Sequence, residues 1–507
     1  AAATKLVLSG SGKLTIGDLD SGVNTVLLTV DASASTGGVV LDGFVGGDVI
    51  VTGGSGDDKF DFTDNGFTAT ADSVVGGEGK DTLVTAASST VLFKGTDDNP
   101  SSGLEALEIK KADVGNGNTI TASGLTMSSI TEFIASSNTA TNNDDAVFAV
   151  TNMDSGDTIS VTTGGADNST LADGVALTGS LTDNGTADVV TLQLQGIGAV
   201  TADTTANTGL AEVTLDSHET INLKTDKNED GTVSVNEIEK LSADELVTLT
   251  VTGASDFKTT NADGLANTTK LTTVDSTGAT GKFEILGIDK SDLTMKLGTG
   301  QNTIGMAALN NADTITGGSH SKDKLTATAT TGLTATTGKL NITDIETVQL
   351  QYTGANTIDA SLLSGVDELS FSGGNSDQTV TGLAAGVKIG IGDSAATIAS
   401  DPTLKVTLAD STGTEDNVTF AVDNSAATTT NVAITMAGVE TATFKVEDDA
   451  NNWAANLSKL EADKIVFTGG NVGAQVTLNA GSDDLFASTS TIDASAYKGN
   501  LLINRTD

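Results

Sequence analysis

Two glycine-rich nonapeptides near the start of the chain combine the residue types that a calcium site needs. They read GGSGDDKFD at 53–61 and GGEGKDTLV at 76–84, and both fit the pattern G-G-x-G-x-D-x-U-x, where U is a large apolar residue. Glycine adopts left-handed backbone angles that turn carbonyl oxygens inward, and aspartate supplies carboxylates to a hard cation. Two Gly-Asp turns without metal are the alternative. The predicted calcium-binding residues are Gly53, Gly56, Asp57, Asp58, Gly76, Gly79 and Asp81.

A twelve-residue segment at 226–237 predicts a second calcium site. Its sequence, DKNEDGTVSVNE, fits the twelve-residue calcium loop position by position, with a glycine at position 6 for the sharp turn and a glutamate at position 12 as the bidentate ligand. The flanks predict a strand over 213–223 and a short helix over 237–246, and an acidic turn is the alternative. The predicted ligands are Asp226, Asn228, Asp230, Thr232, Ser234 and Glu237.

Degraded versions of these motifs occur further along the chain. The segment GGSHSKD at 317–323 resembles the nonapeptide but has one residue too many before its aspartate. We therefore expect Asp313 and Asp323 to contribute to a weaker calcium site, with a solvated turn as the alternative.

The sequence gives little support for a catalytic function. The chain has two histidines, His218 and His320, and neither belongs to an H-E-x-x-H arrangement. There is no cysteine, no G-x-S-x-G turn and no G-x-x-x-x-G-K-[ST] loop. Carboxylate pairs are so frequent that no glycosidase pair stands out. We predict that the chain is not an enzyme.

Short alternating segments are the elements that must hold these motifs in place. Runs such as VTLQL at 190–194 and VTLTVT at 247–252 recur between clusters of Gly, Asn and Asp, and aromatic residues make up only 3% of the 507 residues. Alternation with β-branched residues indicates strands, and the clusters indicate polar turns. The sequence predicts an all-β fold of tandem modules, solenoid-like or sandwich-like, with calcium in the turns. No apolar run is long enough to span a membrane.

The charge and the cysteine content restrict the partners and the compartment. The net charge is −42, which repels nucleic acid and anionic membrane surfaces and favours cations. An extracellular protein without disulfides needs another device to stabilise a loop-rich fold, and bound Ca²⁺ supplies one. The chain begins AAATK rather than with Met, so we expect a processed product or an excised portion of a longer protein.

The chain is also an internal tandem duplication. Ordered matches between its two halves occur at an offset that shrinks from 244 to 219 residues, beginning with VDAS at 30–33 against VDST at 274–277. IDAS at 492–495 begins the pattern a third time. We expect a first module at 1–243, a second homologous module at 244–476 and the start of a third copy at 477–507.

The nonapeptides, the recurring Val/Ile-Asp-Ala-Ser units, the Ile-Glu-Thr segments and the acidic, cysteine-free composition together resemble RTX-type surface-layer proteins of Gram-negative bacteria. This resemblance implies type I secretion, folding outside the cell where calcium is plentiful, and location on the cell surface. It also implies a structural protein that assembles into a two-dimensional lattice (an S-layer). A calcium-rigidified RTX adhesin or biofilm filament subunit is the alternative.

The partners that we expect follow from that resemblance. They are other copies of the chain and, through a region outside it, a cell-surface polysaccharide or lipopolysaccharide. We expect neither nucleic acid nor a membrane span.

Overall fold

The computed structural model describes most of the chain, which forms two compact units. The first unit comprises Ala1–Leu271 with Gly278–Lys282, and the second comprises Thr272–Thr277 with Phe283–Asp507. The described residues are 4–17, 19, 29–44, 48–63, 67, 72–86, 101–111, 118–121, 129–137, 147–163, 176–181, 185–197, 210–227, 235–260, 264–265, 267–290, 292–329, 331–334, 340–352, 354–372, 377–391, 403–422, 431–447, 452–473, 475–480 and 491–505.

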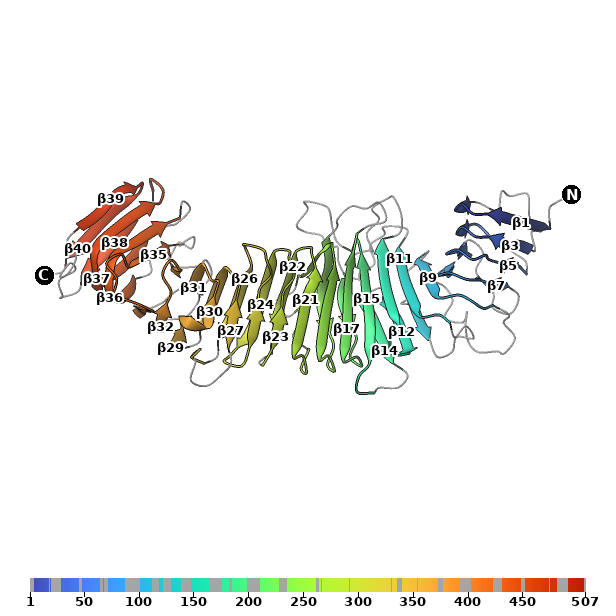
Figure 1. The fold of residues 1–507 in the computed structure, drawn as a ribbon, viewed down its shortest axis with the longest axis horizontal. Helices are drawn as coiled ribbons and strands as arrows, with labels where there is room; N and C mark the ends of the chain where they lie inside the picture. Colours follow the sequence, from blue (N-terminus) through green and yellow to red (C-terminus); the bar gives the residue numbers. More distant parts are fainter. Residues whose placement is uncertain are drawn as a thin grey trace. The chain divides into compact units, whose positions relative to one another are not determined.

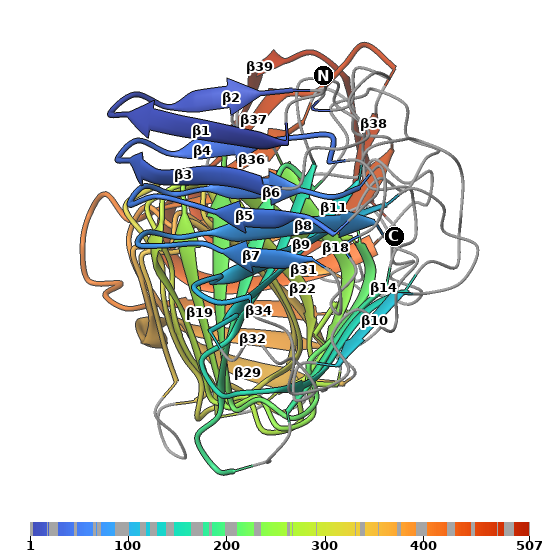
Figure 2. The same cartoon turned by 90° about the vertical axis from the view of Figure 1, so that its right-hand side faces the viewer.

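The first unit consists of short parallel strands stacked in successive coils (Figures 1 and 2). One sheet has the order β1-β3-β5-β7, a second runs from β2 through β4, β6, β8 and β9 and then the odd-numbered strands to β19, and a third contains the even-numbered strands β10 to β20. The strands are β1 (Lys5–Gly10), β2 (Leu14–Ile16), β3 (Thr29–Ser35), β4 (Val39–Leu41), β5 (Ile50–Thr52), β6 (Lys59–Asp61), β7 (Ser73–Val75), β8 (Thr82–Ala86), β9 (Ala106–Lys111), β10 (Asn118–Thr121), β11 (Glu132–Ser137), β12 (Val147–Met153), β13 (Thr158–Thr163), β14 (Ala176–Leu181), β15 (Val189–Gln195), β16 (Leu210–Thr214), β17 (Thr220–Asp226), β18 (Val235–Ser242), β19 (Thr248–Gly253) and β20 (Asp256–Thr259).

The second unit repeats this architecture. Its only described helix is a single 3-10 turn, Ala360–Leu362, which Asp359 caps through a bond from the backbone N–H of Ser361. The strands are β21 (Thr273–Ala279), which contains the unit boundary, β22 (Phe283–Ile288), β23 (Thr294–Lys296), β24 (Asn302–Leu309), β25 (Thr314–Thr316), β26 (Lys324–Ala329), β27 (Asn341–Thr343), β28 (Thr347–Tyr352), β29 (Asn356–Asp359), β30 (Leu363–Ser364), β31 (Glu368–Ser372), β32 (Gln378–Leu383), β33 (Lys388–Ile391), β34 (Thr403–Leu408), β35 (Asn417–Val422), β36 (Asn431–Val446), β37 (Trp453–Gly469), β38 (Gln475–Ala480), β39 (Thr491–Tyr497) and β40 (Asn500–Arg505).

The core follows from the alternation of apolar and polar residues. In β15 every second residue is buried, and Leu192 pairs with Leu223 in the next coil. Because the described pairings are parallel and most keep one register, inward side chains lie against their equivalents one coil later, and apolar columns result. Val30, Val51 and Val74 form such a column, and all three are fully buried. The two units together make up about 14 turns of a parallel β-solenoid.

Stacked rings replace the aliphatic column in part of the second unit. The rings of Phe420, Phe444 and Phe467 lie face to face, with centroids 4.9 and 5.2 Å apart in successive strands. Trp453, the single tryptophan of the chain, lies 5.7 Å from Phe444 and is fully buried. Most of the chain's few aromatic residues that the structure describes are thus packed inside it.

The all-β expectation is confirmed, including strands at 190–194 and 247–252. Two local predictions were wrong. The segment 213–223 forms parts of β16 and β17, separated by a turn, and 237–246 is not helical because most of it belongs to β18, where Asn236 and Ile238 alternate inward. Within the described residues no helix is long and apolar enough to cross a membrane. The module boundary at 243 and 244 stays a prediction.

Candidate metal centre

The two nonapeptides form tight turns that stack directly on each other in consecutive coils. The turn at 53–58 joins β5 to β6, and the turn at 76–81 joins β7 to β8. Backbone bonds tie the stack together: Gly53 N–H donates to Val75 O at 2.7 Å, and Glu78 N–H to Gly54 O at 3.0 Å. A Cβ on Gly76 would lie only 1.7 Å from Gly103 O. The glycines are therefore required by the close approach of neighbouring backbones.

Asp58 serves as a hydrogen-bond acceptor for two coils. Its Oδ1 accepts from Val39 N–H at 2.7 Å and its Oδ2 accepts from Gly54 N–H at 2.7 Å. The side chain is buried, with 1% of its surface exposed. Burial raises the pKa of this carboxyl, and the two backbone donors oppose that rise.

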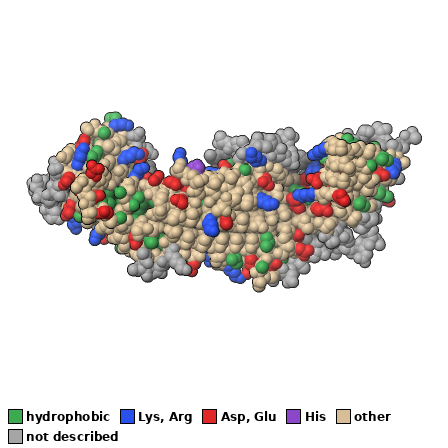
Figure 3. Space-filling view, viewed as in Figure 1, with side chains coloured by type: hydrophobic (Ala, Val, Ile, Leu, Met, Phe, Trp, Pro, Cys, Tyr) green, Lys and Arg blue, Asp and Glu red, His purple; other side chains and the backbone are tan. Residues whose placement is uncertain are grey.

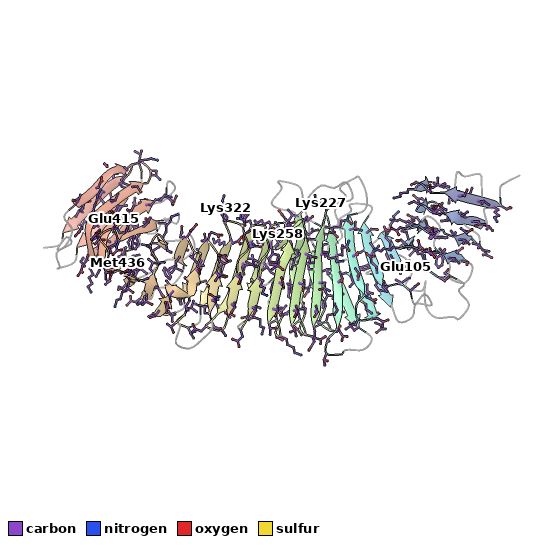
Figure 4. All side chains as sticks on the ribbon, in the orientation of Figure 1. Glu105, Lys227, Lys258, Lys322, Glu415 and Met436 are labelled. Carbon is purple, nitrogen blue, oxygen red and sulfur yellow. The ribbon has the colours of Figure 1, made fainter. Side chains whose placement is uncertain are left out.

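Asp81 lies one coil later, and only one of its two carboxylate oxygens accepts a hydrogen bond. Its Oδ1 accepts from Asp58 N–H at 2.8 Å, and its own N–H donates to Glu105 Oε2 at 2.9 Å. Glu105 lies directly before β9 (Figure 4). The other carboxylate oxygen, Asp81 Oδ2, is buried and has no hydrogen-bond partner. A buried acceptor left in this state is energetically costly.

The electrostatic environment of Asp81 adds to that cost. Burial raises its pKa to about 7, and the nearby carboxylates of Asp58, Glu105 and Asp57 add to the shift. Lys80, the nearest lysine in the sequence, forms an ion pair with Glu132 instead. At neutral pH the Asp81 carboxylate therefore needs a bound proton or a bound cation to offset the cost of burying its charge.

The relationship between Asp81 and Glu105 recurs at three other places in the chain. In each, the glutamate accepts from the N–H of an aspartate in the preceding coil, at 2.6 to 2.9 Å. The four pairs are Asp81 with Glu105, Asp188 with Glu219, Asp323 with Glu346, and Asp416 with Glu440. The glutamates were not predicted as site residues, although they stand in segments that match between the two halves of the sequence, LEAL at 104–107 with IETV at 345–348 and ET at 219–220 with ET at 440–441.

Asp81 differs from the other three aspartates in one respect. Their Oδ2 atoms accept from a glycine N–H of their own turn: Gly185 for Asp188, Gly318 for Asp323 and Gly413 for Asp416. In the 76–81 turn, Gly77 and Gly79 instead have φ of 121° and 115°. Among these four described pairs, only Asp81 has a carboxylate oxygen that is buried without a hydrogen-bond partner.

The donor set in this turn fits calcium. Each carboxylate oxygen has two lone pairs, so Asp58 can accept backbone hydrogen bonds and still approach a cation, and Asp81 Oδ2 is uncommitted. Among the described residues no group of three or more Asp, Glu or His side chains is arranged to hold a metal ion. A calcium ion at this turn would therefore need backbone carbonyl oxygens to complete its ligand set, and Ca²⁺ accepts such ligands. Asp57 is exposed and accepts from Lys80 N–H at 2.9 Å.

The second-half candidates lie at separate corners of the coils. Asp313 precedes β25 and Asp323 precedes β26, and these strands belong to different sheets. Asp313 accepts from Leu293 N–H and Asn310 N–H, both at 2.8 Å. Its carboxylate thus has a donor on each oxygen, and burial raises its pKa. The structure does not bring these two residues together.

Only the ends of the predicted twelve-residue loop can be described. Asn228, Asp230, Thr232 and Ser234 lie outside the described residues. Asp226 ends β17, and Glu237 lies in β18. The Glu237 carboxylate forms an ion pair with Lys258 at 2.6 Å (Lys258 is labelled in Figure 4). A calcium ion at this loop would compete with that lysine.

On the face that Figure 3 shows, acidic and basic side chains are scattered singly or in small groups among backbone and other, uncharged polar side chains. The second unit also has a shallow depression of about 300 Å³ where Gly390 and Ala421 interrupt a row of larger side chains. Gln349, Glu368 and Ser370 line it. Comparison with known proteins finds no family model and no curated protein that matches the chain.

Proposed function

We propose that the chain is a calcium-stabilised structural protein of the bacterial cell surface, which assembles with copies of itself into a two-dimensional lattice. The observation that carries this proposal is the unpartnered Oδ2 of Asp81, buried between two stacked glycine turns. A divalent cation bound there neutralises the carboxylates that desolvation disfavours, and it stabilises the stack because it binds the folded turns.

The use of the ionisable groups supports a structural role. Asp58, Asp188, Asp323 and Asp416 direct their carboxylates at backbone N–H groups, and these bonds fix their own turns and, for Asp58, the neighbouring coil. The glutamates of the four pairs accept from the preceding coil in the same way. A solenoid held by such bonds suits a load-bearing element.

A filament subunit or adhesin stalk is the second candidate. The apolar side chains exposed on β40, Leu502 and Ile503 at 42% and 43% exposure, favour association between copies. Association through one surface alone gives dimers or fibres, whereas a two-dimensional lattice needs further contacts.

Electron microscopy of the purified chain during a calcium titration tests the proposal. We expect ordered sheets at millimolar Ca²⁺, their loss on chelation, and no sheets with Mg²⁺ at the same concentration, because Mg²⁺ fits an irregular carbonyl-rich site poorly. The Asp81→Asn variant should require more calcium. Isolated fibres would favour the filament subunit, and monomers at all calcium concentrations would contradict both candidates.

A further inference from the structure

The segment GTGQN at 298–302 corresponds, in the second half of the chain, to the turn GGSGDD at 53–58. The last residues of the two segments lie 244 positions apart, which is the offset at which the halves begin to match. The aligned pairs at the ends of the two segments are Asp57 with Gln301 and Asp58 with Asn302. Both carboxylates of the first turn are therefore replaced by neutral amides in the second.

Backbone bonds place the two turns at equivalent positions in their coils. The N–H of Asn302 donates to Asp323 Oδ1 at 2.8 Å, and the N–H of Asp58 donates to Asp81 Oδ1 at the same distance. Asp323 directly precedes β26, as Asp81 directly precedes β8. Asn302 thus stands where Asp58 stands in the first unit, one coil before the counterpart of Asp81.

Three oxygen atoms lie within hydrogen-bond distance of the side-chain nitrogen of Asn302. This Nδ2 atom lies 2.7 Å from Gly300 O, 3.2 Å from Gly298 O and 3.1 Å from Asp323 Oδ1. Asn302 and Asp323 are both fully buried. The orientation of the amide follows from these neighbours, because the opposite orientation would place Asn302 Oδ1 against three acceptors. Two backbone carbonyls and a carboxylate therefore converge on one buried donor group.

This arrangement is the reverse of the one at Asp58. There the turn directs the N–H of Gly54 at a carboxylate oxygen, at 2.7 Å. At Asn302 the turn presents carbonyl oxygens, which are ligands that Ca²⁺ takes in proteins, together with a carboxylate. The amide has two N–H donors for them, while its own Oδ1 is buried without a hydrogen-bond partner. The oxygens of the turn are thus satisfied at the expense of one unpartnered acceptor.

We propose that the side-chain amide of Asn302 takes the place of a cation in the 298–302 turn, so that this contact between β24 and β26 forms without calcium. At a calcium concentration too low to fill the site at Asp81, the second unit keeps this contact. The contrast between the two turns rests on the calcium site proposed above, whereas the role of the amide does not. A carboxylate in place of this amide would face the same three oxygens with no donor, and only a bound cation could hold it there.

Hydrogen exchange of the full chain, read by mass spectrometry of its peptides below the protein concentration at which sheets form, tests the proposal in the wild type. Peptides from 73–84 should exchange more slowly in millimolar Ca²⁺ than in chelator, because an ion that binds the folded turn suppresses its opening. Peptides from 302–309 should exchange equally in both conditions. Slower exchange of 302–309 in calcium would overturn the proposal. Unchanged exchange of both segments would contradict the calcium site at Asp81 and support the role of Asn302.

The Asn302→Asp variant should convert the turn into a site that needs a cation. In chelator its melting temperature should fall below that of the wild type, and Ca²⁺ should raise it by about 5 °C or more beyond the rise in the wild type. Isothermal titration calorimetry should detect an additional bound ion. Asn341→Asp is the matched control, since Asn341 is exposed at the start of β27 and the same change there adds a charge away from the three oxygens. An Asn302→Asp chain that behaves like this control, or that calcium does not restore, would overturn the proposal.

Discussion

The backbone N–H of Asp58 donates to Asp81 Oδ1 at 2.8 Å, and this bond between consecutive coils leaves the other oxygen of Asp81 buried without a donor. The orientation of the carboxylate is thus fixed by the fold before any cation arrives. Preorganisation of this kind lowers the cost of ordering a site.

Replacement of Asp81 by Asn should have opposite effects with and without calcium. In chelator, the side-chain amide of the variant keeps an acceptor for Asp58 N–H and removes a buried charge, so the melting temperature should rise or stay unchanged. In calcium the variant should lose most of the stabilisation that the metal gives the wild type. Circular dichroism melts in both conditions measure this difference.

Asp58→Asn is the matched control for that experiment. Both oxygens of Asp58 accept backbone N–H groups, so an amide there must turn its NH₂ toward a donor. We expect a loss of about 1–3 kcal/mol in chelator. Equal losses for the two variants in chelator would argue against a special role for Asp81 Oδ2.

Calcium-free stability should fall as the pH rises from about 4 to above 7. Burial raises the pKa of Asp81 from 3.8 to about 7 and that of Asp157 to about 6. The folded state therefore binds more protons than the unfolded state in this window, and the penalty is absent below pH 3.8 and complete above about 7. One pKa unit corresponds to about 1.4 kcal/mol, so the two carboxyls together contribute at most about 7 kcal/mol.

Urea unfolding at several pH values measures this dependence. The Asp81→Asn variant should give a flatter profile than the wild type between about pH 4 and about pH 8. A wild-type profile that rises with pH over this range would be inconsistent with a buried carboxylate of raised pKa at Asp81.

A methyl group at Gly76 should disrupt the stacked turns. Its Cβ would lie 1.7 Å from Gly103 O and 2.4 Å from Asp81 Oδ2, so the backbones must move apart. We expect Gly76→Ala to cost about 3 kcal/mol or more, at the upper end of overpacking effects. Gly12→Ala is the control, because nothing lies within 4 Å of the corresponding Cβ. Thermal melts of the two variants decide the comparison.

Truncation of Phe444 to alanine should destabilise the second unit by about 3–5 kcal/mol. The ring is buried between Phe420 and Phe467, and its loss leaves a cavity in the column. Trp453, 5.7 Å from that ring, reports the unfolding through its fluorescence. Val472→Ala, at a position that is 84% exposed, should leave the transition unchanged.

The strands and turns could be predicted from local patterns, because alternation and glycine placement act over a few residues. For this reason VTLQL at 190–194 correctly predicts a strand, and the two nonapeptides correctly predict turns that lead into the strands β6 and β8. The sequence predicts a helix over 237–246 because a helix usually follows a twelve-residue calcium loop. The chain forms β18 there instead, and its alternate residues Asn236 and Ile238 are both buried.

The partners of the site could not be predicted in the same way. The bond from Asp81 N–H to Glu105 joins residues 24 positions apart, and its existence depends on the length of one coil. The sequence alone does not show which glutamate lies over which aspartate. The duplication gave an indirect signal, since the segments containing Glu105 and Glu346 match each other and both glutamates make this bond.

A contact between consecutive coils that recurs along the chain has a consequence for how such a chain changes length in evolution. The N–H groups of Thr36, Thr280 and Lys498 donate to the carbonyls of Gly10, Gly253 and Gly469 at 2.8, 2.8 and 2.9 Å, so the same contact occurs three times. Unequal recombination between the gene segments that encode these contacts would add or delete coils without requiring a new kind of contact between them.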